Sequence, residues 1–154
     1  MDIIELKEKK ELLENNKLSG IYVQFQELLK ELRKKGLPHK ISELVNQDIE
    51  ELNSSSFADN ELNKILKKKQ AKILKLLETE LKIVPKGHYK NFWLAIGMCV
   101  FGLPIGTVFG IISDNMGLIG IGLPIGIAIG IVLGSNMDKK AFEEGRQLEV
   151  KIQY

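Results

Sequence analysis

The chain has 154 residues, of which 44% are hydrophobic and 27% are charged, and its formal net charge is +2. These averages hide two unlike parts. Residues 1–90 hold 18 of the 22 Lys and Arg and 15 of the 20 Asp and Glu, whereas residues 91–135 carry one charge, Asp114. Ten of the 14 glycines lie in the same stretch, residues 91–135. The composition excludes a single globular core and a mostly disordered chain, and one cysteine excludes a disulfide scaffold.

Residues 1–85 predict an all-α cytosolic domain, because their apolar residues recur at helical rather than alternating spacing. Asp2 with Glu5, and Ser56 with Asp59, fit capping boxes at the starts of the first and last helices. Gly36 and Pro38 are stop signals between the second and third helices. Four helices are therefore expected, over about residues 2–15, 21–35, 39–53 and 56–84.

The longest of these expected helices has an apolar stripe on one side and lysines on another. The stripe needs a partner, which is either a local antiparallel bundle or an oligomeric coiled coil. The run Lys67, Lys68 and Lys69, with Lys72 and Lys75 beyond it, could contact nucleic acid or anionic lipid. A site that stacks nucleic-acid bases needs aromatic side chains among its basic residues, and none lies among these lysines. We interpret them as a solvated face balanced by nearby glutamates, and nucleic acid is not an expected partner.

Two apolar segments follow and predict a transmembrane hairpin in the lipid bilayer. Residues 92–112 carry no charge, and a helix of 21 residues spans the roughly 30 Å hydrocarbon core. Residues 117–137 form a second span, and the polar residues 113–116 form an external turn between the spans. The remaining parts are a juxtamembrane linker, residues 86–91, and a cytosolic tail, residues 138–154.

Basic residues flank the outer ends of both expected spans, and the turn between the spans has none. The positive-inside rule then places both termini in the cytosol and the turn outside. Aromatic residues also lie where the first span enters the bilayer. The expected interface anchors are Tyr89, Phe92, Trp93, Lys86, Lys90, Lys139 and Lys140.

Glycine recurs every four residues in both spans, which makes a shallow groove on each helix into which another helix can press. The expected helix-packing residues are Gly102, Gly106 and Gly110 in the first span and Gly122, Gly126, Gly130 and Gly134 in the second. The sequence Gly-Leu-Pro-Ile-Gly occurs at residues 102–106 and again at residues 122–126. It places Pro104 and Pro124 near the bilayer midplane, where each is expected to kink its helix.

These repeats resemble the glycine-zipper family of small bacterial membrane proteins. The resemblance covers about residues 91–150 and rests on residues 102–110 and 122–130. The family pattern is a packing motif rather than a catalytic one. It implies tight helix association in a bacterial inner (cytoplasmic) membrane, and members of the family include homo-oligomeric channels and pore-forming toxins.

No catalytic, cofactor-binding or metal-binding residue is expected, because no phosphate loop, dinucleotide fingerprint or nucleophile elbow is present in the sequence. His39 and His88 each lack a second ligand at metal spacing. We expect that the protein is not an enzyme. Three hypotheses remain: a homo-oligomer that self-associates through its glycine zippers and presents residues 1–85, a homo-oligomeric pore gated by those helices, and an adaptor that recruits a cytosolic protein through them.

The end of the chain carries a different pattern. Leu148, Val150, Ile152 and Tyr154 alternate with polar residues, which suggests a short terminal strand. A strand of this length needs a partner to be ordered.

Overall fold

The computed structural model describes residues 2–7, 16–54 and 59–152. The chain forms two compact units: a helical domain, Met1–Pro85 with Leu148–Tyr154, and a hairpin, Lys86–Gln147. The described residues of both units form helices and no strand, so the all-α class is confirmed.

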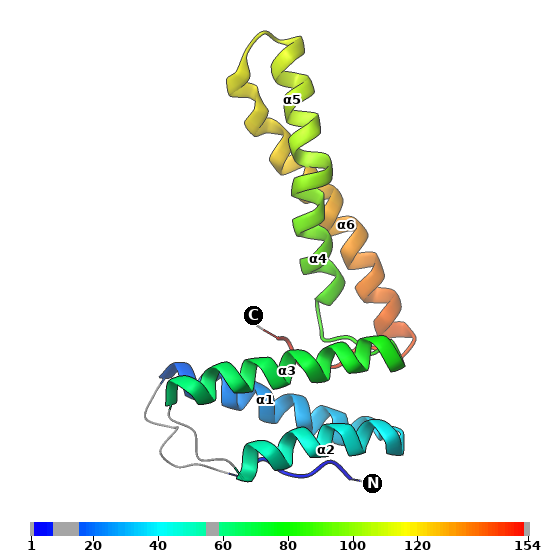
Figure 1. Cartoon of the computed structure of the whole chain (residues 1–154). Coiled ribbons are helices and arrows are strands. Elements are labelled where there is room, and N and C mark those ends of the chain that lie inside the picture. Colours follow the sequence, from blue (N-terminus) through cyan, green and yellow to red (C-terminus); the bar gives the residue numbers. More distant parts are fainter. Residues whose placement is uncertain (1, 8–15, 55–58, 153–154) are drawn as a thin grey trace. The chain divides into compact units, whose positions relative to one another are not determined.

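The helical domain contains α1 (Asn16–Lys35), α2 (His39–Ser54) and α3 (Asp59–Leu81), shown in blue, cyan and green in Figure 1. The helix α3 packs against both α1 and α2, so its apolar stripe is covered within the chain, as in the local-bundle alternative. The innermost side chains are aromatic and branched aliphatic residues with at most 2% of their surface exposed, among them Phe25, Leu28, Leu32, Val45, Ile49, Leu66, Ile73 and Leu77.

The helix α3 ends three residues before the expected end at Val84. Lys82 takes a left-handed conformation with φ of 56°, which a continuing helix cannot contain. The N–H of Ile83 then donates to the carbonyl of Leu77 at 3.1 Å, and the side chain of Val84 is buried. The capping box expected at Ser56 and Asp59 begins at a residue outside the described part of the chain.

The expected first helix is wrong for residues 2–7, which have no helical structure. Ile3 and Leu6 are nevertheless buried in the core of the helical domain. The backbone of this segment is hydrogen-bonded by side chains of α2, described below, and this competes with the local helix signal from Asp2 and Glu5. The remainder of the expected helix, residues 8–15, lies outside the described residues.

The expected terminal strand is also wrong for residues 148–152. The alternation is real, because Leu148, Val150 and Ile152 are buried and the residues between them are exposed. The three apolar side chains enter the core of the helical domain, and the N–H of Leu148 donates to the carbonyl of Val84 at 2.9 Å. The tail is an extended segment packed on helices.

The hairpin begins with α4 (His88–Ile96), a π-helical turn η2 (Gly97–Gly102) and α5 (Leu103–Ile112). After a turn at residues 113–115, the chain returns through a 3-10 segment η3 (Met116–Ile121) and α6 (Gly122–Glu143). Figure 1 shows α5 and α4 running antiparallel to α6.

Two helical segments of the hairpin, His88–Ile112 and Met116–Glu143, are long and apolar enough to cross a membrane. Within their most apolar 18-residue stretches, only 22% and 17% of the residues are buried. The core helix of a water-soluble protein would be mostly buried, so this exposure favours an apolar surrounding for the hairpin.

Candidate functional site

The two helical segments of the hairpin meet along a face made of glycine backbone. All seven glycines expected there are buried. A Cβ atom at Gly122 would overlap backbone atoms of Gly102 and Gly106, and one at Gly126 would overlap backbone atoms of Gly97 and Gly102. Gly102 and Gly106 therefore face Gly122 and Gly126 within one chain, at a separation that leaves no room for a side chain at Gly122 or Gly126.

The same close approach continues to both ends of the hairpin. A Cβ at Gly134 would lie 2.5 Å from Cα of Lys90, and one at Gly130 would overlap the backbone of Trp93. At the turn end, Gly106 lies against the backbone of Ile119. Gly120, by contrast, has open space around it and does not belong to this glycine face.

Gly97 is a member of the glycine face that the sequence pattern does not include. It lies five residues before Gly102, which breaks the four-residue spacing of the series. The π-helical turn η2 contains one more residue per turn than an α-helix and so returns Gly97 to the same side as Gly102. The sequence signal that could have indicated this role is the position of Gly97, five residues before the first glycine of the series and shortly before Pro104.

The chain accommodates both prolines by changing its helix type. Pro104 is the second residue of α5, directly after η2, and the N–H of Leu103 bonds to the carbonyl of Met98 across the π turn. Pro124 is the third residue of α6, directly after the 3-10 segment η3. Each proline thus lies where the hydrogen-bond spacing changes, in the first turn of the following α-helix, a position that tolerates the missing N–H.

The open end of the hairpin is closed by Asp138 of α6. The helix α4 has no side-chain cap at Gly87, and the carboxylate of Asp138 accepts hydrogen bonds from the N–H groups of Tyr89 at 3.1 Å and Lys90 at 3.0 Å. A carboxylate at a helix N-terminus also interacts favourably with the helix dipole. The sequence alone does not indicate this role of Asp138, because the role depends on the register between α4 and α6.

The expected interface anchors lie at this same end of the hairpin. Phe92 is 56% exposed, whereas Trp93 is partly covered and its Nε1 lies 2.9 Å from Sδ of Met137. Tyr89 is also partly covered. The four expected lysine anchors are exposed, and two of them are near glutamates one turn ahead: Lys139 at 3.8 Å from Glu143, and Lys140 at 3.9 Å from Glu144.

In the helical domain, two asparagines of α2 hold the extended amino-terminal segment. Asn46 accepts from the N–H of Ile4 at 2.9 Å and donates to the carbonyl of Asp2 at 3.0 Å. Asn53 makes the same pair of bonds three residues further along the segment. It accepts from the N–H of Lys7 at 2.9 Å and donates to the carbonyl of Glu5 at 3.0 Å. Seven helical residues and three extended residues both advance about 10 Å, so the two spacings match.

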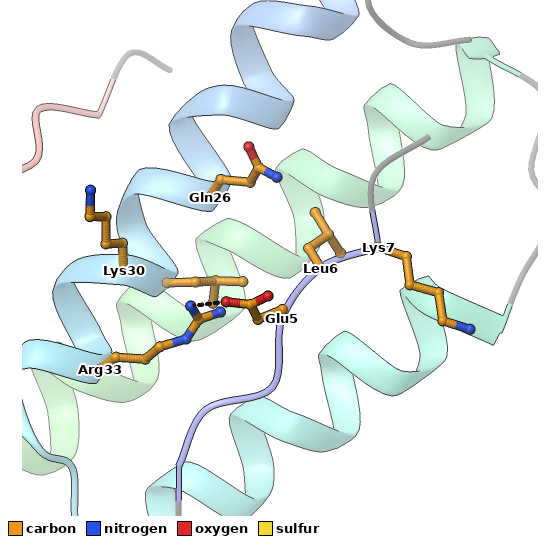
Figure 2. A pocket seen from close by; sticks show the side chains of 7 residues that line it. Glu5, Leu6, Lys7, Gln26, Lys30 and Arg33 are labelled. Atoms are coloured by element: carbon orange, nitrogen blue, oxygen red, sulfur yellow. Dashed lines mark hydrogen bonds and ion pairs between the residues drawn. The ribbon is translucent and has the colours of Figure 1, made fainter. Parts of the chain in front are cut away.

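A groove of about 550 Å³ lies between this extended segment and α1 (Figure 2). Arg33 is committed to holding the segment, since it donates to the carbonyls of Ile3 at 3.0 Å and Ile4 at 3.3 Å and pairs with Glu5 at 2.8 Å. The groove carries no arrangement of nucleophile and base. Its lining residues are Glu5, Leu6, Lys7, Gln26, Leu29, Lys30 and Arg33.

The acidic partners of the lysine-rich α3 are on α2. Asp48 receives hydrogen bonds from Lys69 at 2.6 Å and Lys72 at 2.9 Å, and Lys69 also pairs with Glu51. Burial raises the pKa of Asp48, but the bonds from Lys69 and Lys72 outweigh it and hold that pKa below its ordinary value. The expectation of lysines balanced by acidic neighbours therefore applies to Lys69 and Lys72.

Within the described parts of the chain, no three or more His, Cys, Asp or Glu side chains gather in a way that could hold a metal ion. Comparison of the chain with protein-family models, curated proteins and solved structures finds no match. The functional inference therefore depends on the hairpin and the helical domain themselves.

Proposed function

We propose that this protein is a non-enzymatic integral membrane protein, in which the hairpin is the membrane anchor and the helical domain is the cytosolic part that meets other molecules. The hairpin supplies two spans of sufficient length, and its outward surface is formed by large apolar side chains. Those at least half exposed are Phe92, Val100, Leu103, Val108, Ile111, Ile112, Met116, Val132 and Phe142.

The observation that carries this proposal is the burial of Leu148, Val150 and Ile152 in the core of the helical domain. The chain leaves that domain after Pro85 and rejoins it at Leu148. Both ends of the hairpin are therefore attached to one folded body, which requires that body to lie on one side of the bilayer. Since basic residues flank these ends and none lies in the turn, we place that body in the cytosol. The resemblance of the hairpin to glycine-zipper proteins favours the inner membrane of a bacterium.

The glycine face bears on how copies of the protein would associate. Within one chain each glycine series is covered by the opposite helical segment, so a second copy would contact the outward apolar surface of the hairpin. We therefore propose anchoring and presentation of the helical domain, as in an adaptor, ahead of self-association through the glycines or formation of a pore.

Membrane integration is tested by alkaline extraction of membranes that contain the full-length protein. We expect wild type to stay with the membranes, and we expect the double variant Leu103→Asp/Ile125→Asp to be released. Both side chains are exposed and adjacent to the midplane prolines, where a carboxylate costs about 3 kcal/mol. The matched control Leu103→Ile/Ile125→Leu should stay with the membranes. Release of wild type by the alkaline wash would overturn the proposal.

A further inference from the structure

The exposed side of α3 carries a row of lysines. At about 100° per residue, Lys64, Lys68 and Lys75 fall within about 40° of one another, opposite the buried Leu66 and Leu77. All three lysines are exposed. The row extends about 16 Å along the helix from Lys64 to Lys75.

The lysines of this row form no ion pair with an acid among the described residues. Asp48 and Glu51 pair with Lys69 and Lys72, at the edge of α3 that faces α2. No described residue forms an ion pair with Lys64, Lys68 or Lys75, nor with Lys67 beside them. Glu61 and Glu78 lie three residues beyond the two ends of the row, so the balance expected from the sequence applies at its ends rather than along it.

The chain ties this helix closely to the expected membrane anchor. The helix α3 ends at Leu81 and α4 begins at His88, so six residues connect them. A connection of this length spans at most about 25 Å when fully extended. If the hairpin is anchored in a bilayer, the end of α3 stays within that reach of the headgroups at every moment.

We propose that the lysine row of α3 docks on anionic lipid headgroups of the bilayer in which the hairpin is anchored. This inference rests on the proposed membrane anchoring. Lysine ammonium groups are point charges on flexible stems, so they bind anions without a fixed bidentate geometry. A straight row of them therefore fits the phosphates and carboxylates of a flat, fluid lipid surface. Ala71 lies within the row and keeps it free of bulky side chains. Tethering makes the encounter intramolecular, so weak individual contacts suffice.

The test measures how accessible a spin label on the lysine row is to water in the full-length protein. A spin label at Ala71→Cys, with Cys99→Ala, is measured in vesicles of phosphatidylcholine alone and in vesicles that also contain phosphatidylserine. We expect phosphatidylserine to shield this label from a water-soluble relaxation agent, and high salt to remove the shielding. A reference label at the exposed Gln47→Cys of α2 should respond equally in both vesicles.

Two triple variants distinguish an effect of the lysine row from an effect of the net charge of the domain. The variant Lys64→Gln/Lys68→Gln/Lys75→Gln should lower the ratio of docked to undocked protein roughly 100-fold, at about fivefold per lysine. The matched variant removes three exposed lysines elsewhere in the domain and should retain docking. It is Lys7→Gln/Lys30→Gln/Lys40→Gln.

Three results would overturn the inference: a label at Ala71→Cys that ignores phosphatidylserine, equal losses in the two triple variants, or shielding produced by an added RNA oligonucleotide in place of the lipid. Alkaline extraction of the same vesicles distinguishes the two proposals. A protein that stays integrated but whose label is indifferent to phosphatidylserine refutes only the lipid docking, whereas a protein that is extracted refutes the anchoring.

Discussion

Asp48 is a buried carboxylate whose charge is compensated by two lysines of the neighbouring helix. Its side chain is 6% exposed, and that of Lys69 is 13% exposed. Burial lowers the pKa of Lys69, but its bonds to Asp48 and Glu51 outweigh this and raise it above the ordinary value. With the pKa of Asp48 lowered and that of Lys69 raised, the pair stabilises the folded domain across the neutral range.

We expect Asp48→Asn to lower the free energy of unfolding by about 2 kcal/mol at neutral pH, because Lys69 and Lys72 lose a charged hydrogen-bond acceptor. The pKa of Asp48 in the folded state lies below its ordinary value of 3.8. Its contribution is therefore complete above about pH 4 and is lost as the pH falls through the folded-state pKa.

Urea unfolding of the full-length protein, followed by circular dichroism in detergent, measures this difference as a function of pH. The exposed neighbour Glu50, changed to Gln, provides the matched control and should be close to wild type. A difference between wild type and Asp48→Asn that persists undiminished in acid would contradict the assigned ion pair.

At the scale of elements, the glycine face determines how the two halves of the hairpin cross. Gly122 and Gly120 provide a matched pair, because a methyl group at Gly122 would overlap the backbone of Gly102, while one at Gly120 would meet open space. The effect of an alanine on the hairpin should therefore depend on the space around the glycine that it replaces, and not on the loss of glycine itself.

We expect Gly122→Ala to separate the two helices and destabilise the hairpin by about 2 kcal/mol, as overpacking does. Spin labels at Asn91→Cys and Asn136→Cys, with Cys99→Ala, report the distance between α4 and α6 by pulsed electron resonance. Gly122→Ala should broaden the distance distribution, and Gly120→Ala should leave it unchanged. Dilution with unlabelled protein should have no effect, and a distance lost on dilution would instead indicate contact between chains.

Much of the hairpin could be predicted from the sequence, because charge depletion and a four-residue glycine period are local signals. The role of Gly97 lies outside that four-residue period, since it depends on a π-helical turn. The extended conformation of residues 2–7 also escaped prediction. It depends on Asn46 and Asn53, which are more than forty residues away and carry no sequence sign of their partners.

The ends of α2 and the existence of α1 and α3 followed from periodicity and stop signals. The lysine row did not, because a sequence shows only that acids are abundant near the lysines. The structure shows which lysines those acids pair with. Asp48 and Glu51 both turn to the edge of α3 that contains Lys69, and Lys64, Lys68 and Lys75 remain without an acidic partner among the described residues.

At the scale of the whole molecule, the tail links the end of the hairpin to the helical domain. Leu148 is 1% exposed in that domain, while Lys151 in the same segment is exposed. We expect Leu148→Ala to lower the free energy of unfolding of the helical domain by about 3 kcal/mol, the usual cost of such a truncation in a core. Lys151→Ala should have little effect.

Hydrogen exchange of the full-length protein locates this loss. The amides of α1, α2 and α3 should exchange faster in Leu148→Ala, because the domain opens more often. Faster exchange confined to the tail would show that residues 148–152 are dispensable for the domain, and it would remove the argument that both ends of the hairpin belong to one body.

The central claim is that the hairpin crosses the membrane twice and returns to the domain it left. Single cysteines at Ser54, Asn115 and Lys151, each with Cys99→Ala, test it directly when intact bacterial spheroplasts are treated with a membrane-impermeant maleimide. We expect labelling of Asn115→Cys in intact spheroplasts, and labelling of Ser54→Cys and Lys151→Cys only after permeabilisation. Labelling of Ser54→Cys and Lys151→Cys on opposite sides of the membrane, or equal labelling at all three positions before permeabilisation, would contradict the account.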